Sequence, residues 1–260
     1  LDYARLLQNL GLVAFEAGSD DLAFEFLSER LNLGLNFDDP RSEFLINRAL
    51  AITAFRNNDL ELSRNQIEES LNILSDLRNK ELLDKKTAES YRLELENRSA
   101  LVELELQNFN TAAALFEKIA ANSEKGTENR VRALRNTGFV LFQRARQSSE
   151  TERYETAREA RRTLQKALDE LESIDEFESN DSSGGLFNFG FLFGSNDQST
   201  ANIDFEKKKK KRLIETVLVR LESEFFPPDK SLESLSTRLE RLELKSARTL
   251  AQAMSNTVLL

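Results

Sequence analysis

The sequence predicts an all-α protein, and three observations predict it. The chain of 260 residues is rich in helix-favouring residues and contains only 3 Pro and 9 Gly. Its apolar residues recur with helical spacing in ten segments. A pattern of one small and then one large residue returns in successive segments, which is typical of helices that stack on neighbours of their own kind.

The helical pattern covers almost the whole chain. The predicted helices span residues 2–17, 20–33, 41–57, 60–77, 80–107, 110–122, 126–148, 151–174, 205–225 and 230–257. Gly18-Ser19-Asp20 would end one helix and cap the next. Asp39-Pro40 places an acceptor before a residue with a helical φ, while Asn57-Asn58-Asp59 and Pro227-Pro228-Asp229 would form turns. Such short turns predict antiparallel helix pairs.

Three of these pairs share one register of small and large residues. A small residue on the first helix is followed by a turn residue, then by a small and a large residue on the second helix. The three sets are Gly11, Gly18, Ala23 and Leu27; Ala51, Asn58, Ser63 and Ile67; and Ala100, Gln107, Ala112 and Phe116. A looser fourth pair has Gly138 on its first helix and Ala160 and Leu164 on its second. We interpret these positions as core.

This register resembles the tetratricopeptide repeat (TPR) family over roughly residues 1–175. The small residues of the second helices lie 40 to 49 residues apart, whereas the family period is about 34. The family's Trp in the first helix and its closing Pro are absent here. The resemblance implies a right-handed α-solenoid of antiparallel helix pairs. It implies no particular function, because such arrays bind many unrelated partners.

The composition predicts three segments: an array over 1–175, an insertion over 176–204, and a C-terminal helix pair over 205–260. The final pair would cap the stack with a stripe of leucines: Leu232, Leu235, Leu239, Leu242 and Leu250. In the insertion, two runs of polar and Gly residues flank four phenylalanines at alternate positions, Phe187, Phe189, Phe191 and Phe193. Since exposed Phe clusters are costly in water, these side chains either tuck against the array or dock into a partner groove or a membrane surface.

Six consecutive basic residues, Lys207–Arg212, open the helix expected at 205–225. Two interpretations stay open for them. They form a solvated stretch that offsets neighbouring carboxylates, or they form a patch for an anionic surface such as a lipid membrane. Cations at a helix N-terminus oppose the helix dipole, which raises the case for the second interpretation slightly, although the first stays the favoured one.

Several function classes are excluded by what the chain lacks. With no Cys and no His, it has no thiolate, no imidazole, and no Ser-His or Cys-His catalysis. We therefore expect no catalytic residue, no metal site and no cofactor. The net charge of −9 disfavours nucleic acid. No run approaches the ~20 apolar residues of a membrane span, so we expect a soluble or peripheral protein, in either a periplasmic or a cytoplasmic location.

The function expected from these features is a non-enzymatic protein–protein interaction scaffold. Its groove would bind a partner protein or peptide through polar side chains of the first helices, namely Asn9, Asn47, Asn97, Arg98 and Asn136. The alternative is a structural subunit that stacks edge to edge in a larger assembly. Self-association would distinguish the two.

Overall fold

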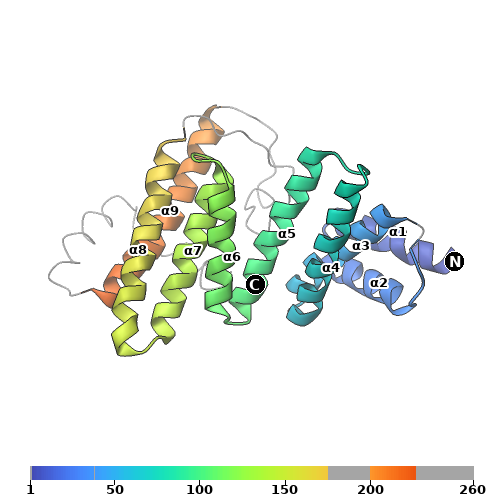
Figure 1. Cartoon of the computed structure of the whole chain (residues 1–260), viewed down its shortest axis with the longest axis horizontal. Helices are drawn as coiled ribbons and strands as arrows, with labels where there is room; N and C mark the ends of the chain where they lie inside the picture. The colour runs from blue at the N-terminus through green and yellow to red at the C-terminus, as the bar shows by residue number, and fades with distance from the viewer. Residues whose placement is uncertain (1, 38, 175–199, 227–260) are drawn as a thin grey trace. The chain divides into compact units, whose positions relative to one another are not determined.

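The computed structural model describes residues 2–37, 39–174 and 200–226 (Figure 1). All regular secondary structure in these ranges is helical, as the sequence predicts. The helices are α1 (Asp2–Glu16), α2 (Asp20–Asn32), α3 (Pro40–Arg56), α4 (Leu60–Asn79), α5 (Lys85–Glu105), α6 (Phe109–Asn122), α7 (Glu128–Gln147), α8 (Glu150–Glu172) and α9 (Thr200–Phe225). The expected helix over 230–257 and the four phenylalanines of the insertion lie outside the described residues.

Local side-chain bonds explain where several helices begin. The Asp39 carboxylate accepts hydrogen bonds from the amides of Arg41 (2.8 Å) and Ser42 (3.0 Å), and Pro40 is the first residue of α3. Asp59 caps α4 through the amide of Leu62 at 3.2 Å. Ser19 occupies the N-cap of α2, but its side chain makes no capping hydrogen bond.

The start of α5 differs from the prediction. The sequence pattern predicts a helix from residue 80, whereas α4 continues to Asn79 and α5 begins at Lys85. Glu81 lies in the left-handed region with φ 55°, which ends α4. Asp84 then accepts a hydrogen bond from the Thr87 amide at 2.9 Å. This N-cap makes residues 80–84 a turn, although the side chains there suit a helix.

The described helices fall into two compact units, Leu1–Asn108 and Phe109–Leu260, here called unit 1 and unit 2. In unit 1 each helix from α1 to α5 packs on the next, and the first helices of the pairs also meet, α1 with α3 and α3 with α5. Such contacts between every second helix are typical of stacked helix pairs. The core between the first two pairs is a cluster of Leu27, Ile46, Ala49 and Leu50.

In unit 2, α6, α7, α8 and α9 pack in the order of the chain, and α7 also contacts α9. Four apolar residues of α9 that recur with helical spacing are buried, namely Ile214, Val217, Leu218 and Leu221, and Leu213 beside them is half-buried. Near the end of the same helix, the Phe225 ring meets Phe142 of α7 edge to face, with centroids 5.9 Å apart.

The predicted repeat register is confirmed at the turns. The three predicted turn residues all adopt a left-handed φ: Gly18 (73°), Asn58 (61°) and Gln107 (59°). In each case the next amide donates to a carbonyl five residues earlier: Ser19 to Ala14 (2.8 Å), Asp59 to Ala54 (2.9 Å) and Asn108 to Glu103 (2.8 Å). Three segments of unlike sequence therefore end their first helix with the same hydrogen-bond pattern.

The small and large residues of the register lie where helices cross. A Cβ atom on Gly11 would lie 2.5 Å from Cδ2 of Leu27, and one on Gly138 would lie 2.5 Å from Cγ of Leu164. In the second pair the Ser63 hydroxyl donates to the Ala51 carbonyl at 2.8 Å. The small residues thus allow close approach of the paired helices in both units. Positions 40 residues apart, such as 11 and 51, are equivalent in the first two pairs.

Candidate interaction surfaces

The five polar residues that the sequence singles out differ in their exposure to solvent. Asn9 is exposed on α1, Asn97 is half-buried on α5, and Asn136 is half-buried on α7 of unit 2. Asn47 and Arg98 are each only 3% exposed. These two side chains lie in the interior of unit 1, where a partner does not reach them. Asn97 donates to the Leu93 carbonyl one turn earlier, and the Asn136 oxygen accepts from Arg135.

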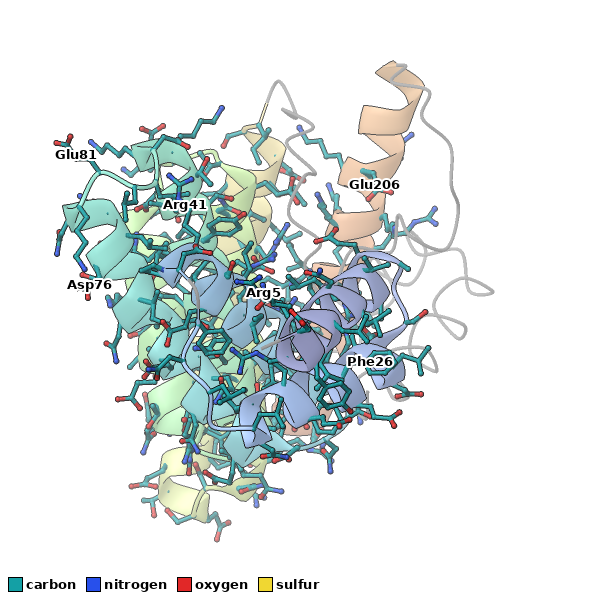
Figure 2. The ribbon with its side chains drawn as sticks, turned by 90° about the vertical axis from the view of Figure 1, so that its right-hand side faces the viewer. Arg5, Phe26, Arg41, Asp76, Glu81 and Glu206 are labelled. Carbon is teal, nitrogen blue, oxygen red and sulfur yellow. The ribbon has the colours of Figure 1, made fainter. Side chains whose placement is uncertain are left out.

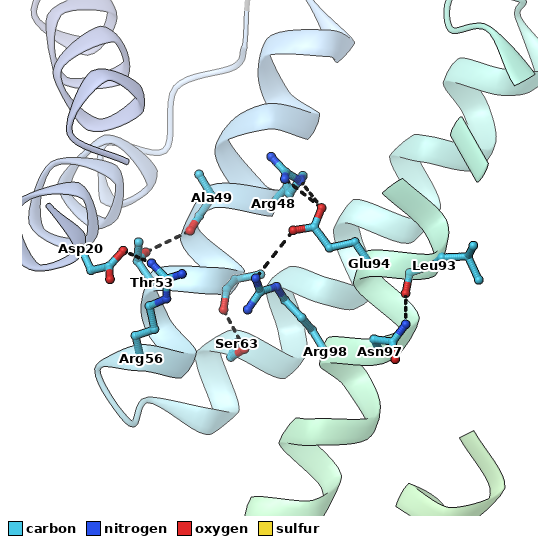
Figure 3. A network of polar contacts seen from close by, with 11 residues as sticks. Asp20, Arg48, Ala49, Thr53, Arg56, Ser63, Leu93, Glu94, Asn97 and Arg98 are labelled. Carbon is cyan, nitrogen blue, oxygen red and sulfur yellow. Dashed lines mark hydrogen bonds and ion pairs between the residues drawn. The ribbon is translucent and has the colours of Figure 1, made fainter. Parts of the chain in front are cut away.

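Arg98 belongs to a buried charged cluster that joins α3 to α5 (Figure 3). The Glu94 carboxylate accepts from Arg48 at 2.8–2.9 Å and lies 3.6 Å from the Arg98 guanidinium. The Glu94 and Arg98 side chains are 7% and 4% exposed. One carboxylate therefore serves two guanidinium groups in a largely dry environment, where an unbalanced charge would be costly.

Aromatic rings and further charges surround this cluster. The Arg48 guanidinium lies over the rings of Tyr91 (5.0 Å) and Phe15 (5.8 Å). Burial lowers the pKa of Arg98 to about 10; Glu94 opposes this shift, and the like charges of Arg56 and Arg48 add to it. Arg98 thus stays protonated at neutral pH. Asn47, on the same helix as Arg48, has a buried Oδ1 with no hydrogen-bond partner among the described residues.

Sequence reasoning missed Arg48 and Glu94. Both residue types are common in the chain and most of them lie on solvated helix faces, so no local signal distinguishes this pair. The one available indication is their spacing within the register. Arg48 follows Phe44 by one helical turn on α3, and Glu94 precedes Arg98 by one turn on α5, so each lies beside a residue that packs inward.

Contacts within unit 2 engage four of the six residues in the basic run. Lys207 donates to the carbonyls of Ile174 (2.6 Å) and Glu172 (3.2 Å) just after and at the end of α8. The others form ion pairs: Lys209 with Glu206, Lys210 with Glu128, and Lys211 with Glu172. The structure supports the interpretation that the run offsets neighbouring carboxylates. The run does not open the helix as expected, because α9 begins at Thr200, and Lys207 within α9 complements the C-terminal end of α8.

The first helix pair exposes an apolar face that the sequence reasoning did not single out. Five large side chains of α1 and α2 are 41–66% exposed: Tyr3, Leu6, Leu10, Val13 and Leu22. We call these five the outer face. Figure 2 looks onto this helix pair, with Phe26 labelled on α2. The signal in the sequence is a double stripe on α1, because Ala4, Leu7, Gly11 and Ala14 form its buried side while 3, 6, 10 and 13 repeat the same spacing on another side.

No group of three or more acidic, His or Cys side chains suited to a metal ion occurs in the part of the chain that the structure describes. Over the same residues, none of the helices combines the length and the apolar character that crossing a membrane requires. Neither a scan of protein-family models nor a search of curated proteins finds a match to this chain.

Proposed function

We propose that the protein is a non-enzymatic interaction scaffold that binds a partner protein or peptide through the groove of its helical repeats. The observation that carries this proposal is the recurrence of one turn geometry, at Gly18, Asn58 and Gln107, together with small-residue helix crossings. Repeated helix pairs that contact only their neighbours expose extended surfaces, and binding is what such surfaces commonly serve.

The finer architecture belongs to the same proposal. We expect TPR-like pairs that form a right-handed α-solenoid, with α9 and the segment 230–257 as a capping pair. The contacts of α1 with α3, α3 with α5, and α7 with α9 support stacking of first helix on first helix. The buried stripe of α9 supports its role in continuing the stack.

The chemistry of the chain also favours binding over catalysis. Thiolate and imidazole groups are absent from the sequence, and the charged groups of the Arg48–Glu94–Arg98 cluster contact one another inside unit 1. Of the five polar residues that the sequence singles out, the three that remain accessible, Asn9, Asn97 and Asn136, are amides. An amide both donates and accepts hydrogen bonds and therefore suits a peptide backbone.

Site-specific photocross-linking tests this function. A photoreactive phenylalanine analogue at Asn97 or Asn136 should capture a defined partner from the host's own extract. The same group at Glu159, an exposed residue of the second helix α8, is the matched control and should not capture it. Equal capture at all three positions, or capture at none, would count against binding through the first helices.

One observation favours a second candidate, a structural subunit that stacks edge to edge with neighbours. The outer face of α1 and α2 leaves large apolar side chains in water, which is common where another chain packs. Sedimentation across a range of protein concentrations distinguishes the two. Concentration-dependent oligomers would favour the subunit, whereas a monomer at all concentrations would favour the scaffold. Anionic-surface binding through Lys207–Arg212 is a weaker candidate, because most of these cations already have contacts.

A further inference from the structure

The residues of the second helix pair that are equivalent to the outer face indicate what kind of partner this face would bind. Leu6, Leu10 and Val13 of α1 correspond, 40 residues later, to Ile46, Leu50 and Thr53 of α3. The three residues on α3 are fully buried, at 0% exposed. The same side of the repeat is thus covered in the second pair and open in the first.

The structure also shows what covers that side in the second pair. Ile46 and Leu50 pack in one cluster with Leu27 of α2, and half-buried side chains of α1 and α2 close around it: Leu12, Phe15, Phe24 and Leu31. Leu62 of α4, which is equivalent to the exposed Leu22, packs against the same cluster. The natural complement to this side of the repeat is therefore an α-helix that carries large apolar side chains.

The charges carried by α1 and α2 specify this helix further. Within α1 and α2 there are six carboxylates, Asp2, Glu16, Asp20, Asp21, Glu25 and Glu29, against two arginines, Arg5 and Arg30. Arg30 is buried and donates to the carbonyls of Leu35 and Asn36. Moreover, Arg56 of α3 pairs with Asp20 of the preceding helix pair, and its equivalent on α1 is the exposed Glu16. In the second pair, the cation lies on α3 and the carboxylate lies on α2, which packs against α3. In the first pair the carboxylate of Glu16 lies on α1 itself. A helix that covers the outer face would therefore need a cation at the position where α2 has Asp20.

We propose that the outer face binds an amphipathic protein helix whose apolar stripe is flanked by Lys or Arg. This inference rests on the scaffold function proposed above and names a surface and a partner class for it. The outer face consists of five side chains on two helices, fewer than the about 20–30 residues that each partner contributes to a standard stable interface, so its size suits one helix. The excess of carboxylates on α1 and α2 disfavours both a second copy of the same face and an anionic membrane.

Two designed peptides test the proposal. Each carries Leu at positions i, i+3, i+7 and i+10, the spacing of the α1 stripe, and is flanked by Lys in one peptide and by Glu in the other. Fluorescence anisotropy with the full chain should show the Lys peptide binding at least about tenfold tighter than the Glu peptide. Raised salt should reduce that difference, because rim charges act mainly through screened attraction.

Matched variants locate the binding surface. Leu6→Glu/Leu10→Glu should weaken binding of the Lys peptide by more than about tenfold, because it places charge in the apolar stripe. Tyr154→Glu, at a residue of α8 that is 50% exposed, is the control and should leave binding unchanged. Should the double variant lose its helical circular dichroism, Val13→Glu at the most exposed position of the stripe replaces it.

Four results would overturn the proposal. These are equal binding of both peptides, unchanged binding by the outer-face variants, a wild-type dimer that these variants convert to a monomer, and outer-face-dependent binding to phosphatidylglycerol vesicles. In the second case, continued photocross-linking at Asn97 would leave the scaffold function standing and remove only this inference. If the photoreactive group at Asn97 captures no partner while the Lys peptide still binds, the proposed groove function is refuted and the proposal for the outer face stands.

Discussion

Glu94 is the residue on which the charge balance of unit 1 depends. Replacing it by Gln removes the negative charge that faces the guanidinium groups of Arg48 and Arg98. We expect Glu94→Gln to lower the free energy of unfolding by about 3–5 kcal/mol, since an uncompensated buried charge is strongly destabilising. Urea denaturation measures this. Glu61→Gln, at a surface carboxylate whose side chain is 68% exposed, is the control and should cost less than about 1 kcal/mol.

The lowered pKa of Arg98 makes a second prediction at the residue scale. The folded protein lowers this pKa to about 10, whereas the unfolded chain keeps the ordinary, higher value of an arginine. Between these values the unfolded state binds more protons, so the contribution of Arg98 to stability rises with pH. From pH 9 to pH 11, the unfolding free energy of the wild type should therefore rise relative to that of Arg98→Met. A pH-independent difference would show that Arg98 titrates as an ordinary arginine.

Close approach of helices depends on the glycines of the register. A methyl group at Gly138 would overlap Leu164 at 2.5 Å, so we expect Gly138→Ala to destabilise by about 1–3 kcal/mol despite the better helix propensity of Ala. Thermal denaturation gives the value. Gly138→Ala/Leu164→Ala should be less destabilised than the sum of the two single variants. Simple additivity would contradict a direct clash.

At the scale of elements, turns with a left-handed residue end the first helices of three pairs at equivalent places. Gln107 has φ 59°, a conformation that costs a residue with a side chain about 1 kcal/mol or more. We expect Gln107→Gly to be neutral or to stabilise by up to about 1 kcal/mol, as glycine adopts this φ without a steric penalty. Leu106→Gly, one residue earlier at φ −73°, should instead destabilise. If both variants lower the melting temperature by the same amount, this account of the turn is refuted.

The elements also show why some boundaries were predictable and others were not. Asp39-Pro40 and Asn58-Asp59 carry their signals in adjacent residues, and the structure has α3 and α4 begin there. The start of α5 was missed because Glu81, a good helix former, adopts a left-handed φ. Helix propensity does not reveal this change of φ, because the capping residue, Asp84, lies three residues later.

At the scale of the whole molecule, α8 and α9 pack together although 27 residues separate their ends. Loop-closure entropy grows slowly with length. Replacing residues 179–199 by a short Gly-Ser linker should therefore change the melting temperature little. Scanning calorimetry provides the test. A loss of several kcal/mol would show that Phe187, Phe189, Phe191 and Phe193 contribute to the core.

The sequence by itself determined the helical class, the register and most of the core. In both units, the small residue of one helix packs closely against the large residue of its partner helix, as Gly11 does with Leu27 and Gly138 with Leu164. Only the tertiary structure decided which polar residues are accessible. Asn47 and Asn97 look alike in sequence, yet the first is buried and the second half-buried, because burial depends on neighbouring helices that sequence spacing does not specify. It also decided that Leu6, Leu10 and Val13 stay exposed while their equivalents Ile46, Leu50 and Thr53 are covered. The physical reason is that an apolar side chain is driven out of water only where another helix is present to cover it.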